Sequence, residues 1–200
     1  TFTVLKRNQE EIARRVGCNI VIQMVADKDI EKARHIVGSQ TIVTENAQEI
    51  VANPDIEIII ELIGGQTIAK ELILQAINNG KHVVTANKAL LANHGSEIFS
   101  AAQQTGVIVA FEAAVAGGIP IIKALREGLT ANRIEWIAGI INGTSNYILS
   151  EMREKGLAFS TALTTAQRLG YAEADPTYDI EGIDAAHKIT IMAAIAFGIP

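Results

Sequence analysis

Cysteine, aromatic side chains and an excess of basic residues are what this sequence lacks. Its only cysteine, Cys18, cannot form an internal disulfide and supplies no metal cluster, which fits a reducing cytosol. Aromatic residues make up 4% of the 200 residues, so we expect a core built mainly from Ile, Val, Leu and Ala. The net charge is −5 and no basic cluster offsets it, which argues against nucleic acid as the main partner.

Long apolar runs are also absent. The longest are about ten residues and are interrupted by Gly or Glu, so no segment is long enough to span a membrane. The charged, amphipathic opening is not typical of a signal peptide. With 48% hydrophobic and 20% charged residues, the composition predicts a globular, cytoplasmic protein of one large or two small domains. Thr1 lies inside an expected helix and Pro200 directly follows another, so we expect a fragment of a longer protein.

Strands and helices alternate with short connections through the first half. The expected strands are 19–26, 42–43, 56–63, 81–85 and 107–111, and the expected helices are 2–16, 29–36, 47–52, 67–78 and 96–104. This alternation predicts an α/β fold with a parallel, doubly wound sheet. Ligands of such sheets bind outside the carboxyl ends of the strands, where Gly64, Ala86, Asn87 and Lys88 fall.

The usual opening of a dinucleotide-binding sheet is not in the sequence. A strand and a GxGxxG loop should precede the first helix, and without that strand two strand edges would lack a partner. Asp27 follows the next strand and is placed to hold a ribose hydroxyl, and Lys28 beside it could instead meet a 2′-phosphate. By spacing alone, a solvated turn explains both residues equally well.

The pattern changes at Glu112, which predicts a first domain of residues 1–111 and a second of residues 112–200. The second begins with a glycine-containing loop that leads into a helix at Pro120. A strand is expected at 134–141, and further helices are expected at 146–155, 160–169 and 183–197. The second domain is therefore predicted to be of the α+β class.

An acidic stretch at residues 168–188 is the most unusual part of the chain. It contains five carboxylates, namely Glu173, Asp175, Asp179, Glu181 and Asp184. Asp184 and Lys188 are four residues apart on the helix that follows, so they share a face. One interpretation is a solvated acidic loop, with Lys188 extending to water. The other is a polar site whose carboxylates bind a substrate ammonium group and whose Lys188 acts as an acid or base.

Three other elements have both a functional and a structural interpretation. Lys88 at a strand end is either a site residue or a surface lysine. Glu112 and the carbonyl groups of the loop after it either bind a hard cation or simply turn the chain into a helix. The helix start at 142–146, which includes Gly143 and Thr144, either receives an anion such as a substrate carboxylate or is an ordinary capped helix.

Four stretches closely resemble the homoserine dehydrogenase family, and they occur in order along the whole chain. They are TANKALLA (85–92), FEAAVAGGIPII (111–122), GIINGTSNYIL (139–149) and LGYAEADPTYDIEGIDAAHK (169–188), the last being the most specific. The resemblance implies an incomplete Rossmann-type domain followed by a catalytic and dimerisation domain. It also implies interconversion of L-homoserine and L-aspartate 4-semialdehyde with NAD or NADP, in the threonine and methionine pathway.

The resemblance further implies roles for individual residues. Lys188 would be the general acid/base, and Lys88 would be a second catalytic or orienting cation. Substrate-binding roles would fall to Glu173, Asp179 and Asp184, and Gly170 would approach the nicotinamide. A monovalent cation, usually sodium, would be bound by Glu112 and the carbonyls of Val115, Gly117 and Ile119. Members of the family are dimers or larger, so we expect a homodimer or homotetramer.

Two alternatives to this function remain open at the level of sequence. The absence of the glycine loop allows a module without turnover that senses a ligand or mediates dimerisation. An aldehyde dehydrogenase that acts on a phosphorylated or acyl substrate would need a nucleophilic cysteine in the crevice. Cys18 is expected on the far side of the sheet from the acidic loop, which disfavours that reading.

Overall fold

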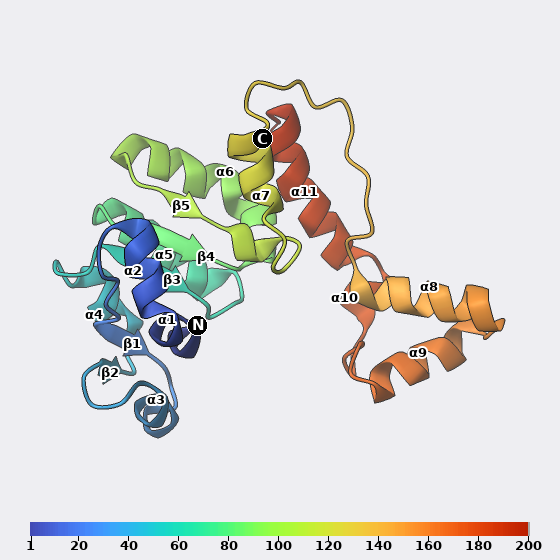
Figure 1. The fold of residues 1–200 in the computed structure, drawn as a ribbon, viewed down its shortest axis with the longest axis horizontal. Coiled ribbons are helices and arrows are strands. Elements are labelled where there is room, and N and C mark those ends of the chain that lie inside the picture. Colours follow the sequence, from blue (N-terminus) through green and yellow to red (C-terminus); the bar gives the residue numbers. More distant parts are fainter. Residues whose placement is uncertain (200) are drawn as a thin grey trace. The chain divides into compact units, whose positions relative to one another are not determined.

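The computed structural model describes residues 1–199, which form a mixed α/β fold (Figure 1). The elements of the first part are α1 (Phe2–Arg7), α2 (Gln9–Val16), β1 (Met24–Ala26), α3 (Ile30–Val37), β2 (Ile42–Thr44), α4 (Ala47–Ala52), β3 (Ile58–Glu61), α5 (Thr67–Asn78), β4 (His82–Thr85), α6 (Lys88–Thr105) and β5 (Val109–Ala110). The predicted alternation of strands and helices is confirmed. Four strands are shorter than predicted, and β1 occupies only the end of the apolar run 19–26, whereas β2 is one residue longer than the predicted 42–43.

The chain divides into two compact units. The first contains residues 1–61, 67–84 and 99–109, and the second contains residues 62–66, 85–98 and 110–200. Helix α6 contributes to both. Each unit has its own core and its own polar clusters, and they are described separately below.

The five strands form two sheets rather than one. β1 pairs with β2 in parallel, with Val25 opposite Val43, and the second sheet has the order β3-β4-β5. β3 is therefore at an edge of its sheet, as β1 is of its own.

The core of the first unit includes one face of α5. Its buried residues follow the spacing of a helical stripe and are Ala69, Leu72, Ile73, Ala76 and Ile77. Ile68 falls outside this stripe and is 61% exposed.

Lys81 is buried in the first unit, with 4% of its surface exposed. Its ammonium group donates hydrogen bonds to the carbonyl oxygens of Asn53 at 2.5 Å and Ile56 at 2.6 Å. These oxygens belong to the connection between α4 and β3. Lys81 therefore ties that connection to β4, and its charge is solvated by backbone carbonyl groups.

The second unit consists mainly of helices. In chain order they are the 3₁₀ turn η1 (Glu112–Ala114), α7 (Ile121–Lys123), the π-helical turn η2 (Ala124–Gly128), α8 (Gly143–Lys155), α9 (Phe159–Arg168), α10 (Thr177–Ile180) and α11 (Ile183–Phe197). Helix α6 is longer than the predicted 96–104, because it begins at Lys88 directly after β4 and continues through Gly95. The short helix α10 inside the acidic stretch was not predicted.

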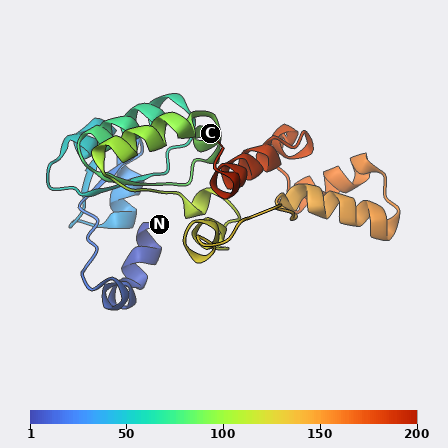
Figure 2. The same cartoon turned by 90° about the horizontal axis from the view of Figure 1, so that it is seen from above.

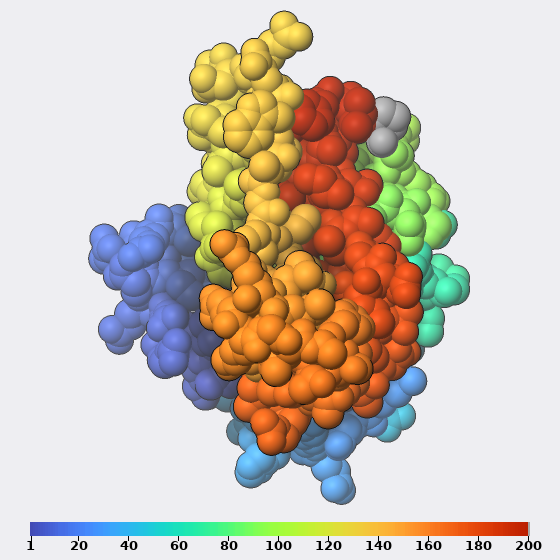
Figure 3. Space-filling view, turned by 90° about the vertical axis from the view of Figure 1, so that its right-hand side faces the viewer, coloured from blue at the N-terminus to red at the C-terminus, as the bar shows by residue number. Residues whose placement is uncertain are grey.

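The strand predicted at 134–141 is wrong. The segment is extended, but no residue in the described part of the chain pairs with it in a ladder. Trp136 and Ile140 are consequently 74% and 79% exposed. Figure 3 shows the yellow residues of this region at the surface beside the red α11, where 132–135 line a hollow together with Ala196 and Phe197. An alternating apolar pattern is typical of a strand, but a strand forms only where an adjacent strand can hydrogen-bond to it.

Helices α8 and α9 form an antiparallel hairpin within the second unit (Figures 1 and 2). Its small core contains Ile148, Ala162, Ala166 and Ala172. The rings of Tyr147 and Tyr171 lie against each other with centroids 4.7 Å apart. This packing fixes the start of the acidic stretch against the hairpin. Among residues 1–199, no helix is long and apolar enough to cross a membrane.

Candidate active site

Two lysines and an aspartate meet in the second unit. Asp184 Oδ1 lies 2.9 Å from the Lys88 ammonium, and Asp184 Oδ2 lies 2.6 Å from the Lys188 ammonium. Lys188 also donates to the Ile141 carbonyl oxygen at 2.7 Å. The side chain of Asp184 is 8% exposed, that of Lys188 18% and that of Lys88 38%. The cluster is therefore graded from a buried carboxylate to a cation that solvent can reach.

Local structure explains how these residues meet. Gly182 adopts a left-handed conformation with φ of 76° and begins α11, which places Asp184 in the first turn of that helix. Lys188 follows one turn later on the same face, as the four-residue spacing predicted. Lys88 comes from the first residue of α6. Its contact with Asp184 could not be read from sequence spacing.

The pKa of Asp184 is lowered to about 2. Burial alone would raise this pKa, because it penalises the charged form. Hydrogen bonds from Lys188, Lys88 and Asn142 favour the carboxylate and outweigh burial. Asp184 is thus a fixed negative charge at neutral pH, which suits a residue that orients cations rather than one that transfers a proton.

Asn142 connects this cluster to the acidic loop, a role that its position at a helix start does not predict. Its side-chain amide donates to Asp179 Oδ1 at 2.8 Å and to Asp184 Oδ2 at 2.9 Å. Its Oδ1 accepts from the Ser145 backbone N–H at 2.7 Å and so caps α8. The sequence does hold one signal for this role. An Asn that caps a helix uses only its side-chain oxygen, so its NH₂ group still has two protons to donate to other acceptors.

The loop that carries Glu173 is held from both helices of the hairpin. Thr144 donates its hydroxyl to the Tyr171 carbonyl at 2.6 Å, and Gln167 donates its side-chain amide to the carbonyls of Glu173 and Ala174, each at 3.2 Å. Gly170 has φ of 79° and turns the chain between α9 and this loop. Glu173 is exposed, and only its backbone is fixed by these contacts.

The residues predicted at the start of α8 lie beside the same cluster. Gly143 and Thr144 are the first two residues of that helix, directly after Asn142. The N–H of Ser145 is used by the cap, and the N–H of Asn146 donates to the Asn142 carbonyl. Ser145 also donates its hydroxyl to the Asp179 carbonyl at 3.1 Å, so α8 and the acidic loop are bonded at this point.

The structure brings most of the predicted cofactor residues together at one loop pair. The Asn87 amide donates to the Gly65 carbonyl at 2.6 Å, and Asn87 Oδ1 accepts from the Leu90 N–H, which caps α6. Gly64 and Gly65 both have positive φ, and Ala86 and Lys88 flank Asn87 in sequence. The predicted ribose residue Asp27 belongs to the first unit, where its carboxylate accepts from the Asp29 N–H; its neighbour Lys28 is exposed.

Glu112 uses both carboxylate oxygens within the second unit. Oε1 accepts from the Ile122 N–H and Oε2 accepts from the Lys123 N–H, each at 2.9 Å, so Glu112 caps the start of α7. The loop between them turns sharply, with φ of 58° at both Ala116 and Gly117. The expected cation site, with the carbonyls of Val115, Gly117 and Ile119, falls on this turn. Among the described residues, no group of three His, Cys, Asp or Glu side chains could hold a metal ion.

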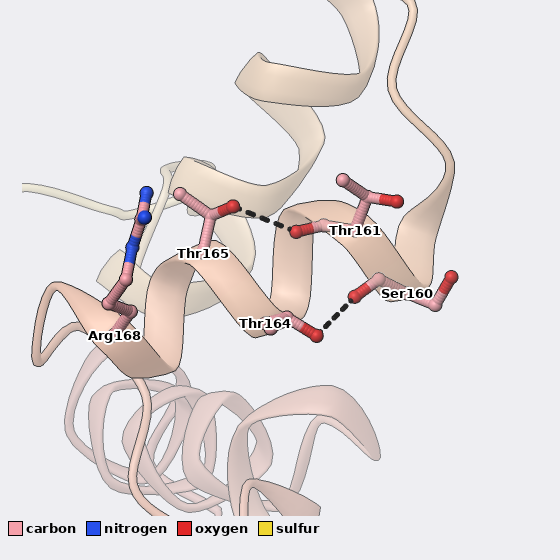
Figure 4. A pocket seen from close by; sticks show the side chains of 5 residues that line it. All are labelled: Ser160, Thr161, Thr164, Thr165 and Arg168. Atoms are coloured by element: carbon pink, nitrogen blue, oxygen red, sulfur yellow. Dashed lines mark hydrogen bonds between the residues drawn. The ribbon is translucent and has the colours of Figure 1, made fainter.

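A surface hollow of about 380 Å³ lies on α9 and includes none of the predicted site residues. Its lining residues are Ser160, Thr161, Thr164, Thr165 and Arg168 (Figure 4). Two of the hydroxyl groups donate back into their own helix, from Thr164 to the Ser160 carbonyl and from Thr165 to the Thr161 carbonyl. The hollow is therefore the outer face of a helix.

Comparisons with known proteins identify the family of the chain. A family model described as "Homoserine dehydrogenase, NAD binding domain" matches residues 1–112, and one described as "Homoserine dehydrogenase" matches residues 120–200. A homoserine dehydrogenase from Pseudomonas aeruginosa is 64% identical over 200 residues, covering 100% of this chain and 46% of that protein. One from Neisseria gonorrhoeae is 64% identical and covers 98% and 45%.

Solved structures of homoserine dehydrogenases also match this chain. The structure of a homoserine dehydrogenase from Thiobacillus denitrificans matches with a TM-score of 0.93 and 67% identity, over 99% of this chain and 46% of that one. A hyperthermophilic archaeal homoserine dehydrogenase in complex with NADPH matches with a TM-score of 0.81 and 28% identity, over 100% and 69%.

These matches first define the class, a Rossmann-type NAD-binding domain joined to a second, dehydrogenase-specific region. More particularly, the chain belongs to the homoserine dehydrogenase family. It spans about half the length of the curated relatives it matches.

Proposed function

We propose that the full-length protein interconverts L-homoserine and L-aspartate 4-semialdehyde with NADP or NAD, in threonine and methionine biosynthesis. The observation that carries this proposal is the pair formed by Asp184 and Lys188, with Lys88 on the second oxygen of the same carboxylate. Oxidation of an alcohol carbon requires a proton to leave its oxygen, and reduction of the aldehyde requires one to return. Lys188 is the group that we assign to this transfer.

Hydrogen-bond counting supports the assignment. A lysine ammonium has three N–H donors, and Lys188 uses one on Asp184 and one on the Ile141 carbonyl. The remaining donor is available for the oxygen of the reacting carbon. In the reductive direction the protonated Lys188 gives its proton to that oxygen, and in the oxidative direction the neutral amine accepts it. Lys88 orients the same oxygen as a second cation.

The two ends of homoserine call for opposite charges. Its ammonium group would be bound by the carboxylates of Glu173, Asp179 and Asp184. Its carboxylate would be bound by the backbone N–H groups of Gly143 and Thr144 at the start of α8. This division is supported by the hydrogen bonds that join α8 to the acidic loop through Asn142 and Ser145.

NADP or NAD, when bound, supplies the hydride acceptor. The residues that would hold it are Gly64, Ala86, Asn87, Lys88 and Gly170, with Asp27 and Lys28 at the ribose. The hydrogen bond from Asn87 to the Gly65 carbonyl and the positive φ of Gly64 and Gly170 support this set, because such turns leave the backbone open to close approach by a ligand.

A monovalent cation, which we take to be sodium, would sit at Glu112 and the carbonyls of Val115, Gly117 and Ile119. One carboxylate and three carbonyls of a tight turn are the oxygen donors that a hard cation takes, and each carboxylate oxygen keeps a further lone pair beyond its bond to the backbone. The cation would then brace the turn between the cofactor-binding and catalytic parts.

We further propose that residues 1–111 are the cofactor-binding domain and residues 112–200 the start of the catalytic and dimerisation domain. The protein would be a cytoplasmic homodimer or homotetramer. Its partners would be small-molecule substrates rather than nucleic acid or membrane.

The proposal is tested by homoserine-dependent reduction of NADP⁺ and NAD⁺ by the full-length protein, followed by absorbance. Turnover is expected, and the two rates give the cofactor preference. Homoserine binding without reduction of either cofactor would instead support a ligand-sensing or dimerisation module. Neither turnover nor binding would show that homoserine is not the ligand.

A further inference from the structure

Asn142 sits between two carboxylates and has a partner for every polar group of its side chain. Its Nδ2 donates to Asp179 at 2.8 Å and to Asp184 at 2.9 Å, and its Oδ1 accepts from the Ser145 N–H at 2.7 Å. The residue is only 9% exposed. The two acceptors come from different elements, since Asp179 lies on α10 and Asp184 on α11.

Only one orientation of this amide satisfies the network. A rotated amide would place its oxygen against the carboxylates of Asp179 and Asp184 and its NH₂ against the Ser145 N–H, which loses three hydrogen bonds and adds repulsion. The start of α8 therefore dictates where the two amide protons point. Those protons in turn fix the distance between the two carboxylates.

A neutral donor has a particular advantage at this position. Two carboxylates near each other repel, and a lysine or arginine between them would remove the repulsion by neutralising them. The Asn142 amide bonds to both without cancelling either charge. Asp184 then keeps its charge for Lys88 and Lys188, and Asp179 keeps an oxygen for a further cation.

We propose that Asn142 is a positioning residue that holds Asp179 and Asp184 in one arrangement, so that the substrate ammonium group and Lys188 are presented in a fixed relation. This inference rests on the proposed function, because it assigns the ammonium group to the same carboxylates. Asn142 itself transfers no proton and needs no contact with the reacting atoms.

Two substitutions separate positioning from a merely structural role. Asn142→Asp keeps the size and the helix cap, because Asp and Asn are equally good at that position, but it turns a carboxylate oxygen toward Asp179 and Asp184. Asn142→Ser also caps α8 but is too short to reach both carboxylates. Asn132→Asp, at an exposed position in the second unit, is the control for the added charge.

The assay is steady-state kinetics of homoserine oxidation by the full-length protein across pH, with thermal unfolding as the check on folding. We expect the KM for homoserine to rise about tenfold to a hundredfold in Asn142→Ser, which is the range for lost hydrogen bonds to charged groups. In Asn142→Asp the acidic limb of kcat/KM should also move to higher pH, because a further carboxylate nearby disfavours ionisation of Asp184. Asn132→Asp should change neither quantity.

If both Asn142 variants fold and keep the wild-type KM and pH profile, the proposed role is wrong and Asn142 only caps α8. If the wild-type protein itself does not oxidise homoserine, the proposed function fails, and NMR titration of the aspartate carboxyl carbons decides the positioning role separately. Asn142→Asp is then expected to raise the pKa of Asp184. An unchanged titration would overturn the positioning role without reference to catalysis.

Discussion

Lys81 in the first unit and Lys188 in the second are both largely withdrawn from water, but their surroundings differ. Lys81 donates to two backbone carbonyls, those of Asn53 and Ile56. Lys188 donates to one carbonyl, that of Ile141, and to the carboxylate of Asp184. Asp184 holds a second lysine, whereas the interactions described for Lys81 involve only neutral groups.

In our proposal, this difference separates a structural lysine from a catalytic one. Carbonyl oxygens fix the position of Lys81 and connect two segments of backbone, which needs no change of charge. Lys188 has an opposite charge at hydrogen-bond distance, and the same carboxylate also binds Lys88. The same side chain therefore serves to hold the fold in one unit and, in our proposal, to transfer a proton in the other.

The largest effect on activity is expected when Lys188, like Lys81, has only neutral hydrogen-bond partners. Asp184→Asn keeps the shape of the side chain but removes the charge that holds both lysines. We expect kcat/KM for homoserine to fall by at least about 100-fold, because a positioned acid or base contributes that much or more. Steady-state kinetics at several pH values measure this, with Glu181→Gln in the same acidic stretch as the control. Activity of Asp184→Asn within threefold of wild type would contradict the role given to the cluster.

A substitution at Lys81 is expected to change the free energy of unfolding rather than activity. Lys81→Met keeps the length of the side chain but leaves the carbonyls of Asn53 and Ile56 without their donor. We expect the free energy of unfolding to fall by about 1–3 kcal/mol, the cost of unsatisfied buried acceptors. Urea denaturation measures it, with exposed Lys32→Met as the control. An unchanged free energy of unfolding would show that Lys81 does not brace the first unit.

Acid should weaken the cluster around Asp184, because the pKa of this buried carboxylate is lowered by its hydrogen bonds. The pKa of Asp184 is about 2 in the folded chain and near its usual 3.8 when unfolded, so its stabilising contribution is complete above about pH 4. That contribution is lost as the pH falls from about 4 through 2. The difference in free energy of unfolding between wild type and Asp184→Asn should therefore shrink over this range. A constant difference from pH 5 to pH 2 would contradict the lowered pKa.

The smallest effect is expected at the loop that carries Glu173. Gln167→Met keeps the length of the side chain but removes the donor to the carbonyls of Glu173 and Ala174. We expect the KM for homoserine to rise about fivefold with little change in kcat, because roughly 1 kcal/mol of exposed hydrogen bonding is lost. Gln167→Lys, which can still donate, should restore it. Equal KM values in all three proteins would show that this clamp does not affect the site.

Local patterns predicted the parts of this structure that depend on neighbours in sequence. The helices α5 and α11 and the pair of Asp184 and Lys188 follow from helical spacing. The contact of Lys88 with Asp184 depends on the path of the chain between them, and no local pattern encodes that path. Resemblance to a family placed the two lysines in one site, whereas spacing alone did not.

The failures have the same cause. Residues 134–141 have the composition of a strand, but nothing in an apolar pattern states whether a neighbouring strand is present. Asn142 was identified as a helix cap from its position, which accounts for its oxygen and not for its amide protons. Its acceptors, Asp179 and Asp184, lie far along the chain. Long-range partners of a polar side chain are determined by the tertiary fold, so local sequence patterns do not predict them.

The most direct test of the account compares the two lysines in one assay. Homoserine-dependent reduction of NADP⁺ and NAD⁺ is measured for full-length wild type, Lys188→Met and Lys81→Met, each shown to be folded at the assay temperature. The account predicts turnover by wild type and by Lys81→Met, and a loss of about 100-fold or more in Lys188→Met. Comparable turnover by Lys188→Met and wild type would contradict it.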